Sequence, residues 1–518
     1  MSLFCRYYYD APVTSGVLES VEATRLREAW ELMRLHPAWF AGTIVYLILV
    51  IWGFLTAHRV PSPFTNRCLI AGLLISFLAL PVGVVLWLHG DPPSNFSPSA
   101  IYSKTKYLIL WQCYPLDLVY SQYTLIVGRR AVEEARARRQ SFVFPGVRRT
   151  TTSAGAEVYV VFIGESSRRA SWSLFGYSRN TNPELSSLPP DEARGLFLFD
   201  NVRSNSNITL LSLPLTLTRA TPDDLSPVRD EKSIVSLANQ AGFDTYWIST
   251  QEKFGGFANS VTSMALEAHH VKFLASDLHH GGIFDGLGTG AYDQAILKPL
   301  SDAIAQNTGN PKKMIFLHTM GSHADYTARV PKDAEAFHLP PAPGVRFAAM
   351  GISRDRVDAY DDSILYTDFV VRQVIDTLAK LHFPTAFVYF SDHGERMDCP
   401  AFPNESFSHG FLPPTPDELN IPVFVWLSPD YMRLHPEAAA AAKSNEHFHT
   451  SLMALFDTIA DLIRVDLDRT APSQSLLISS PAPATLDILQ VDGQVRLRNM
   501  PLASCGTSLL SKSQHGGS

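Results

Sequence analysis

The chain has 518 residues, which is enough for a membrane region and one large globular domain. Its formal net charge of −7 argues against a nucleic-acid partner, because such partners select basic surfaces. The five cysteines form no Cys-x-x-Cys pair, which argues against a cysteine zinc site, and charged residues make up only 18% of the chain, as expected if part of it lies in lipid.

Two uncharged runs near the start, 38–57 and 68–88, predict membrane-spanning helices, since each is about as long as a bilayer requires. Two buried core helices are the alternative. The loop between the runs contains His58, Arg59 and Arg67 and no acid, so the positive-inside rule places this loop in the cytoplasm and the main domain outside it. No small-residue cleavage site follows the first run, so we interpret it as an anchor and not as a signal peptide.

A third stretch, 107–127, is either another span or an amphipathic surface helix, because it contains Pro115 and Asp117 beside apolar residues. It completes a membrane-anchor region over 1–130. A basic linker, 131–155, is expected to follow. The arginines of this part of the chain would favour a cytoplasmic flank, but we interpret them as resting on anionic headgroups; they are Arg129, Arg130, Arg136, Arg138, Arg139, Arg148 and Arg149.

From about residue 156, short apolar runs rich in β-formers alternate with helical stretches. The expected strands are 158–163, 245–248, 314–317, 386–390 and 422–427, and the expected helices are 231–241, 291–306 and 363–381. Strands without strict alternation that are separated by helices indicate an α/β domain with a mostly parallel central sheet. This domain is expected over 156–470. A C-terminal extension, 471–518, is expected to form one hairpin around Asp492 and Gly493 and to end in disorder.

Side chains of the kinds that bind metals directly follow the predicted strands. They are Glu165 after the first strand, His318 and His323 after 314–317, Asp392 and His393 after 386–390, and His409 before 422–427. In such sheets ligands bind at the carboxyl ends of the strands, so four segments are expected to meet at one edge. Asp392 and His393 carry a carboxylate and an imidazole, which are standard zinc ligands. An ordinary exposed turn is the alternative for this triplet with Gly394.

Four segments, taken in chain order, resemble signatures of the bacterial phosphoethanolamine transferases, which belong to the alkaline-phosphatase and sulfatase superfamily. They are 164–183 (GESSRRASWSLFGYSRNTNP), 318–323 (HTMGSH), 360–368 (YDDSILYTD) and 391–395 (SDHGE). The resemblance covers roughly 156–465, and the motifs are specific jointly and not singly. It implies an alkaline-phosphatase or sulfatase-like fold with helices flanking the sheet.

The resemblance also implies a threonine nucleophile at a helix start, and the segment 206–214 (SNITLLSLP) places it at Thr209. Zinc favours the alkoxide of a bound hydroxyl, and a helix N-terminus stabilises an anionic phosphate. Without the resemblance, a helix-capping threonine is an equal alternative. Ser212 is the competing hydroxyl, and we expect it to be structural.

The zinc set that the resemblance implies consists of Glu165, Thr209, Asp392 and His393, with one zinc ion and a second left open. The expected roles of the remaining residues are less specific. His323 and His409 would bind phosphate, hold a second metal or protonate a leaving group, with surface histidines as the alternative; His318 would lie behind the ligands, and Gln251 and Lys253 would contact the phosphate.

The sequence departs from the family pattern at several positions. Asn207 and Leu215 lie where relatives often carry cysteines, and Asp362 stands where the helix signature often has asparagine. Relatives that act on lipid A typically have five membrane helices, against the two firm spans here. These departures leave the metal motifs intact and favour a lipopolysaccharide-core or other glycan acceptor over lipid A.

The resemblance therefore implies transfer of phosphoethanolamine from phosphatidylethanolamine to an envelope glycolipid, through a phospho-threonine intermediate. It places the catalytic domain in the periplasm of a Gram-negative bacterium, anchored in the inner membrane. A phosphodiesterase or a glycerol-phosphate transferase of the same superfamily remains an alternative. An inactive binding or sensor domain is a further alternative, against which the intact metal set argues. Sulfatase activity is disfavoured, because Ser212–Thr216 lacks the final arginine of the Cys/Ser-x-Pro-x-Arg motif.

Overall fold

The computed structural model describes most of the chain after residue 115. The described residues are 116–150, 155–253, 259–274, 292–323, 326–337, 354–397, 409–410, 414–468, 471–489 and 496–497, with isolated positions at 44, 45, 48 and 52. The two spans expected at 38–57 and 68–88 therefore lie outside the described residues, apart from those positions. Among the helices of the described part, none combines the length and the apolar character needed to cross a bilayer.

A seven-stranded sheet forms the centre of the described domain, with the strand order β3-β9-β8-β2-β7-β5-β6. Its strands are β2 (Glu157–Gly164), β3 (Leu196–Phe199), β5 (Asp244–Ser249), β6 (His270–Phe273), β7 (Lys312–His318), β8 (Thr385–Ser391) and β9 (Val423–Leu427). Only β9 runs against its neighbours in this sheet, and the pairs from β8 through β6 are all parallel. The predicted α/β class with a mostly parallel sheet is confirmed.

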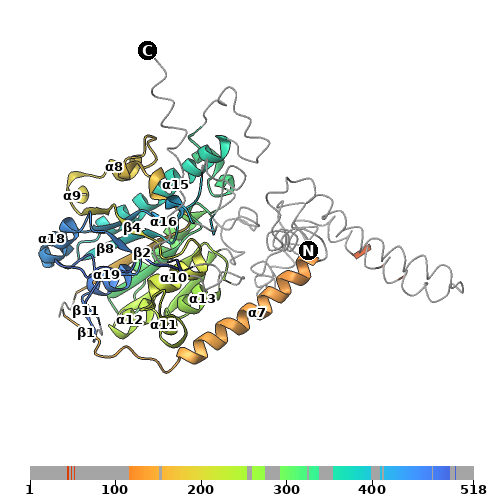
Figure 1. Ribbon diagram of the computed structural model, residues 1–518, viewed down its shortest axis with the longest axis horizontal. Coiled ribbons are helices and arrows are strands. Elements are labelled where there is room, and N and C mark those ends of the chain that lie inside the picture. Colours follow the sequence, from red (N-terminus) through yellow and green to blue (C-terminus); the bar gives the residue numbers. More distant parts are fainter. Residues whose placement is uncertain are drawn as a thin grey trace, which may run out of the picture. The chain divides into compact units, whose positions relative to one another are not determined.

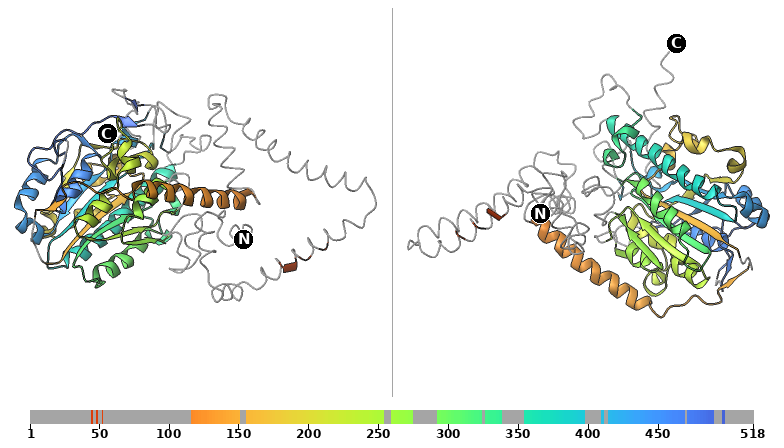
Figure 2. Two further views of the ribbon diagram at one scale, coloured as in Figure 1. Left: turned by 90° about the horizontal axis from the view of Figure 1, so that it is seen from below. Right: turned by 180° about the vertical axis from the view of Figure 1, so that it is seen from behind.

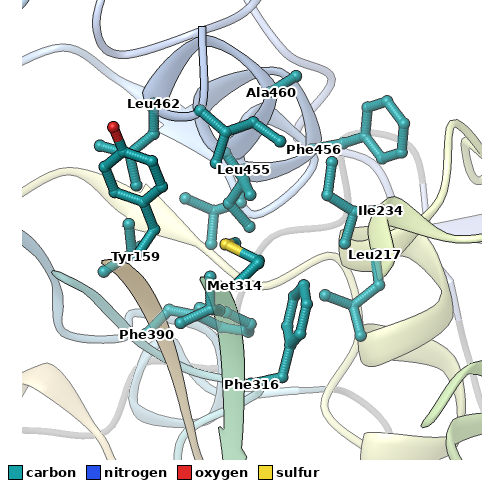
Figure 3. Packing of buried hydrophobic residues seen from close by; sticks show 14 of the residues in the cluster. Tyr159, Leu217, Ile234, Met314, Phe316, Phe390, Leu455, Phe456, Ala460 and Leu462 are labelled. Carbon is teal, nitrogen blue, oxygen red and sulfur yellow. The ribbon is translucent and has the colours of Figure 1, made fainter. Parts of the chain in front are cut away.

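Helices cover both faces of the sheet (Figures 1 and 2). On one face lie α10 (Thr209–Leu217), α12 (Ile234–Gln240), α13 (Asn259–Ala265) and α19 (Ala454–Leu462), and on the other lie α8 (Pro183–Ser186), α14 (Leu297–Ala305) and α15 (Arg354–Ala379). Residues of β2 alternate between the two buried clusters, and Tyr159 faces the first (Figure 3). Burial on both faces explains why this strand lacks polar alternation.

Shorter elements complete the domain. They are β1 (Arg148–Arg149), α9 (Pro190–Ala193), β4 (Val202–Arg203), α11 (Ser226–Asp230), α16 (Pro416–Leu419), α17 (Pro429–Leu434), α18 (Pro436–Ser444), β10 (Thr450–Ser451), β11 (Val465–Asp466), β12 (Ile488–Leu489) and β13 (Arg496–Leu497). Strand β12 pairs antiparallel with β13, which agrees with the hairpin expected around Asp492 and Gly493.

The segment before the sheet is more closely integrated than a linker. Helix α7 (Leu116–Arg139) runs through the boundary expected near residue 131. Phe144 is buried in the core cluster on the α10 face, and β1 pairs antiparallel with β11. The packed domain thus begins before residue 156, because an aromatic side chain upstream of that point is needed to fill its core.

Three of the arginines assigned to the lipid surface bind the domain. Buried Arg139 donates to the Ser263 hydroxyl at 2.6 Å, Arg149 pairs with Glu157 at 2.7 Å, and Arg148 pairs with Asp466 at 2.8 Å. The expectation of headgroup contact is therefore corrected for Arg139 and Arg149, and the Arg139 charge also faces Glu267 at 3.7 Å. The Arg148 side chain is largely exposed, so its contact with headgroups stays a prediction.

The aspartates of the 360–368 motif hold loops in place. Asp361 of α15 accepts hydrogen bonds from the Tyr177 hydroxyl at 2.8 Å and from Arg179, both of which belong to the 164–183 motif. Asp368 accepts the backbone N–H groups of Glu184 at 2.7 Å and Leu185 at 3.2 Å, where α8 begins. The 360–368 motif is thus joined to the 164–183 motif by the hydrogen bonds of Asp361, which hold the loop of Tyr177 and Arg179 against α15.

Replacing Asp361 by asparagine is expected to lower the free energy of unfolding by about 3 kcal/mol, since it removes the charge of a fully buried carboxylate that pairs with Arg179. Urea unfolding followed by tryptophan fluorescence measures the change. Asp376→Asn is the matched control on the same helix, because Asp376 pairs with Arg372 at the surface and such pairs contribute under about 1 kcal/mol. Equal losses in the two variants would contradict the prediction.

Candidate metal centre and nucleophile

Glu165 and Asp392 meet because the strands that precede them are neighbours. Strands β2 and β8 pair in parallel, with Gly164 opposite Ser391, so the residue after each strand emerges at the same edge of the sheet. His393 follows Asp392 directly, and the three side chains are buried. One ligand atom from each lies within 4.8 Å of the others, which is close enough for a single ion.

Thr209 is the first residue of α10 and lies against this group. Its hydroxyl oxygen is 3.1 Å from Glu165 Oε2, 3.2 Å from Glu165 Oε1 and 3.3 Å from His393 Nε2. The position expected for the nucleophile is therefore in contact with two members of the expected zinc set. A helix start there also suits an anion, because the first N–H groups of a helix lack intrahelical acceptors.

The donor atoms of the group fit a zinc ion. Asp392 Oδ1 accepts the backbone N–H groups of Ser166 at 3.1 Å and His393 at 2.7 Å, while the buried Oδ2 accepts no hydrogen bond from the described residues. His393 Nδ1 lies 2.8 Å from the Gly394 carbonyl, which accepts and cannot donate. The carbonyl thus fixes a proton on Nδ1 and leaves Nε2 facing the two carboxylates, where a metal ion would bind in place of the Nε2 proton.

The charges of the group also favour a cation. Burial raises the pKa of Asp392, and the carboxylate of Glu165 raises it further. Burial acts in the same direction on Glu165, but the hydrogen bond and charge of His393 hold the pKa of Glu165 well below its usual value. Burial lowers the pKa of His393, yet the two carboxylates outweigh it and leave that pKa raised. Two buried acids around one ring have a negative charge that a divalent cation would offset.

The backbone of the site leaves little room. A Cβ at Gly394 would lie 1.9 Å from the Asp417 carbonyl oxygen, and a Cβ at Gly321, which has a φ of +49°, would lie 2.7 Å from the Glu165 carbonyl oxygen.

Ser212 donates its hydroxyl to the carbonyl of Asp392. Ser212 therefore supports the metal motif through a backbone contact, in agreement with its expected structural role.

Two further histidines lie beside the metal group. The His409 ring is centred 4.2 Å from that of His393 and 5.6 Å from that of His323. His409 Nδ1 is 2.9 Å from Glu395 Oε2, and the Tyr326 hydroxyl donates to the other Glu395 oxygen at 2.9 Å. Burial lowers the pKa of His323. The structure thus brings both predicted histidines to the site, and it adds Glu395 as the group that orients His409.

The remaining predicted residues lie at different depths. Gln251 donates to Glu165 Oε2 at 3.1 Å, so it belongs to the group. His318 is buried behind it with Nδ1 3.2 Å from the Ser249 hydroxyl, and burial lowers the pKa of His318 to about 4 despite the opposing charge of Glu165. The backbone carbonyl of Lys253 accepts a hydrogen bond from Thr262, and the contact of Lys253 with phosphate stays a prediction.

Sequence reasoning missed Asp293, which shapes the loop after β7. Its fully buried carboxylate accepts the Thr250 hydroxyl at 2.6 Å and the backbone N–H groups of Met320 at 2.9 Å and Gly321 at 2.8 Å. It thereby sets the course of the chain that leads to His323. No motif surrounds Asp293. The one signal in the sequence was its position in the expected helix 291–306, where an acid among apolar residues suggests a buried carboxylate with hydrogen-bond donors around it.

Comparisons with known proteins agree with this geometry. Residues 157–465 match the sulfatase family. Among curated relatives, YhbX of Escherichia coli K12 is 31% identical over 302 residues, covering 58% of this chain and 48% of the relative. The phosphoethanolamine transferase EptC of Escherichia coli K12 is 29% identical over 328 residues, covering 61% of this chain and 52% of EptC. The chain thus spans about half the length of these relatives.

Solved structures support the same assignment. The C-terminal periplasmic domain of Escherichia coli EptC, determined in complex with zinc, superposes with a TM-score of 0.57 at 26% identity, covering 67% of this chain and 92% of that domain. The resemblance to phosphoethanolamine transferases, inferred above from four motifs, is confirmed. Because the family match covers more than half of the chain, this protein belongs to the sulfatase family.

Proposed function

We propose that this protein transfers phosphoethanolamine from phosphatidylethanolamine to an envelope glycolipid, with Thr209 as the nucleophile. The observation that carries the proposal is the position of the Thr209 hydroxyl, which lies within 3.3 Å of both Glu165 and His393 in the buried group that also contains Asp392. The reaction is suggested by the relative EptC, which is named as a phosphoethanolamine transferase.

Glu165, Thr209, Asp392 and His393 would hold one zinc ion. When bound, zinc lowers the pKa of a hydroxyl and offsets charge on phosphoryl oxygens. Glu165 accepts the Thr209 hydroxyl hydrogen bond, which directs the oxygen toward the ligand group. Helix α10 starts at Thr209, so its N-terminal dipole favours the anionic phosphodiester at the same point.

The transfer would take place in two displacements. In the first, a bond forms between Thr209 Oγ1 and phosphorus, the hydroxyl proton passes to solvent, and the bond from phosphorus to the diacylglycerol oxygen breaks. That oxygen gains a proton, for which His409 and His323 are the nearest predicted donors. In the second, the oxygen of an acceptor hydroxyl bonds to phosphorus and gives its proton to solvent. The bond from phosphorus to Thr209 breaks, and Thr209 Oγ1 takes up a proton from solvent, which regenerates the free hydroxyl.

The cellular setting follows from the same relatives. The EptC domain of known structure is periplasmic, so we place the catalytic domain in the periplasm, anchored in the inner membrane by the N-terminal region. A membrane anchor suits a lipid donor. The acceptor we favour is a lipopolysaccharide-core sugar, because the sequence departs at several positions from relatives that act on lipid A. Lipid A is the alternative, since one relative is named as a Kdo(2)-lipid A phosphoethanolamine transferase.

Intact-mass analysis of the full chain tests the proposal. Full-length protein in detergent, loaded with zinc and mixed with phosphatidylethanolamine, is expected to gain the mass of one phosphoethanolamine group on the peptide that contains Thr209. Thr209→Val, which keeps the side-chain shape and lacks the hydroxyl, is expected to gain nothing. Release of phosphoethanolamine by that variant at the wild-type rate would overturn the threonine mechanism and favour a hydrolase that uses activated water.

A further inference from the structure

The chain segment that leads into α10 is held by residues far downstream. Asn205 is buried, and its side-chain amide donates to the carbonyls of Thr485 and Asp487, both at 3.0 Å. The backbone N–H of Leu489 returns a hydrogen bond to the Asn205 carbonyl at 2.7 Å. Three hydrogen bonds thus join the segment Thr485–Leu489, here called the C-terminal clasp, to a residue four positions before Thr209.

The C-terminal clasp also contacts the flank of the helix itself. Leu489 is fully buried and packs with Leu215 of α10 and with Ala220, which follows this helix. Leu211, two residues after Thr209 in the first turn of α10, packs against the same small cluster. The clasp therefore contacts both the approach to α10 and its side, and it restrains where the helix begins.

The clasp lies outside the part of the chain that defines the family. The sulfatase match ends at residue 465, and Thr485–Leu489 follows it by about twenty positions. The contacts of the clasp with Asn205 and α10 are therefore made by residues outside the matched region. Ser204, next to Asn205, donates its hydroxyl to the Asp392 carbonyl at 2.6 Å, so the same segment is tied to the metal motif on its other side.

We propose that the C-terminal clasp is a positioning element that sets the Thr209 hydroxyl against the metal group through Asn205. This inference rests on the proposed function, because it takes Thr209 as the nucleophile. Precision matters at this point, since a displacement of about 1 Å at a reacting group lowers the rate by about 10²-fold. Asparagine suits the task because its amide supplies two hydrogens to two carbonyls.

The chain contains a matched control for this contact. Asn445, which follows α18, is also buried and also donates both amide hydrogens to carbonyls of the C-terminal extension, those of Leu476 at 2.9 Å and Ile478 at 2.8 Å. Its contacts hold the extension near α18 and not near α10. In the wild-type protein each of these amides donates two hydrogens to two carbonyl oxygens. Asn205→Asp and Asn445→Asp each replace the amide by a carboxylate, which has no hydrogen to donate and is repelled by both carbonyls.

The experiment compares these two variants in the full chain, with Asn205→Ala as a milder third variant. Each protein is assayed for zinc content, for melting temperature and for kcat with phosphatidylethanolamine. We expect Asn205→Asp to lose about 10²-fold in kcat with its zinc content unchanged. Asn445→Asp should have a kcat within about twofold of the wild-type value and a melting temperature similar to that of Asn205→Asp, because Asn445 contacts the extension far from Thr209. Equal kcat values in the two variants would overturn the clasp.

Hydrogen exchange separates the failure of the clasp from the failure of the proposed function. If the wild-type protein carries no adduct on Thr209, the proposed function fails, and exchange at residues 204–212 decides the clasp alone. Faster exchange there in Asn205→Asp, with wild-type exchange in Asn445→Asp, supports the positioning role. Unchanged exchange at 204–212 in all three variants refutes it.

Discussion

Thr209→Val is expected to lower kcat/KM for phosphatidylethanolamine by about 10⁴-fold or more, the range seen when a catalytic nucleophile is removed. Valine matches threonine in shape, so the first turn of α10 should form as before. The hydroxyl that contacts Glu165 and His393 is lost, and with it the atom that would bond to phosphorus. Steady-state kinetics with purified full-length protein measure the change.

Thr209→Ser is the informative partner of this variant. Serine keeps the hydroxyl and loses only a methyl group, so we expect it to retain a measurable fraction of the wild-type kcat and to form the covalent adduct. Ser212→Ala provides a second comparison, because Ser212 is the other hydroxyl of this helix that faces the metal group. The Ser212 hydroxyl donates to the carbonyl of Asp392, so its hydrogen is engaged with the backbone and not with a phosphate. A Thr209→Val enzyme as active as Thr209→Ser would rule out the nucleophile assigned here.

Removing zinc is expected to lower the melting temperature of the wild-type protein by about 6 °C at a zinc concentration of about 1,000 Kd, where ligand binding contributes about 4 kcal/mol. The site is buried and binds only in the folded state, so the full linkage applies. Differential scanning fluorimetry with and without a chelator measures the shift. Zinc content by elemental analysis gives a reading that does not depend on activity.

Asp392→Asn is expected to abolish most of this shift without lowering the stability of the zinc-free protein. The amide oxygen of asparagine can still accept the N–H groups of Ser166 and His393, so the backbone contacts survive. The charged ligand atom Oδ2 is replaced by a neutral amide nitrogen, which does not bind zinc. Asp376→Asn, a change of the same chemistry at the surface, should keep the full shift. An Asp392→Asn protein that zinc stabilises as well as wild type would contradict the assigned ligand set.

Local patterns were enough to predict the class of fold and to bring Glu165, Asp392 and His393 together as a candidate metal group. Strand β2 is apolar throughout because both of its faces are buried, and Glu165 stands directly after it. The same reasoning applies to Asp392 and His393 after β8. These predictions depend on strand ends alone, which short-range sequence reveals. The meeting of the two ends depends on the pairing of β2 with β8, which was inferred from the general rule for parallel sheets.

Long-range partners were beyond such reasoning. The 360–368 motif was recognised only as a family signature, and the sequence did not show that Asp361 and Asp368 bind loops almost two hundred residues upstream. Arg139 looks like a lipid contact because it stands in a basic run, yet it is buried against Ser263. In each case a charged side chain has a partner that sequence separation conceals, and only the folded chain reveals which charges are already matched.

The pairing of β1 with β11 has a consequence for how such a domain is joined to other segments. Arg148 faces Asp466 across this pair, so the chain enters the domain and completes its family core at adjacent points. A module whose two ends meet can be attached to different neighbours, or inserted into another chain, without any rearrangement of its interior. The residues on either side of the matched region therefore leave the domain at neighbouring points on its surface, so a change in what precedes Arg148 does not require a change in the order of the central strands.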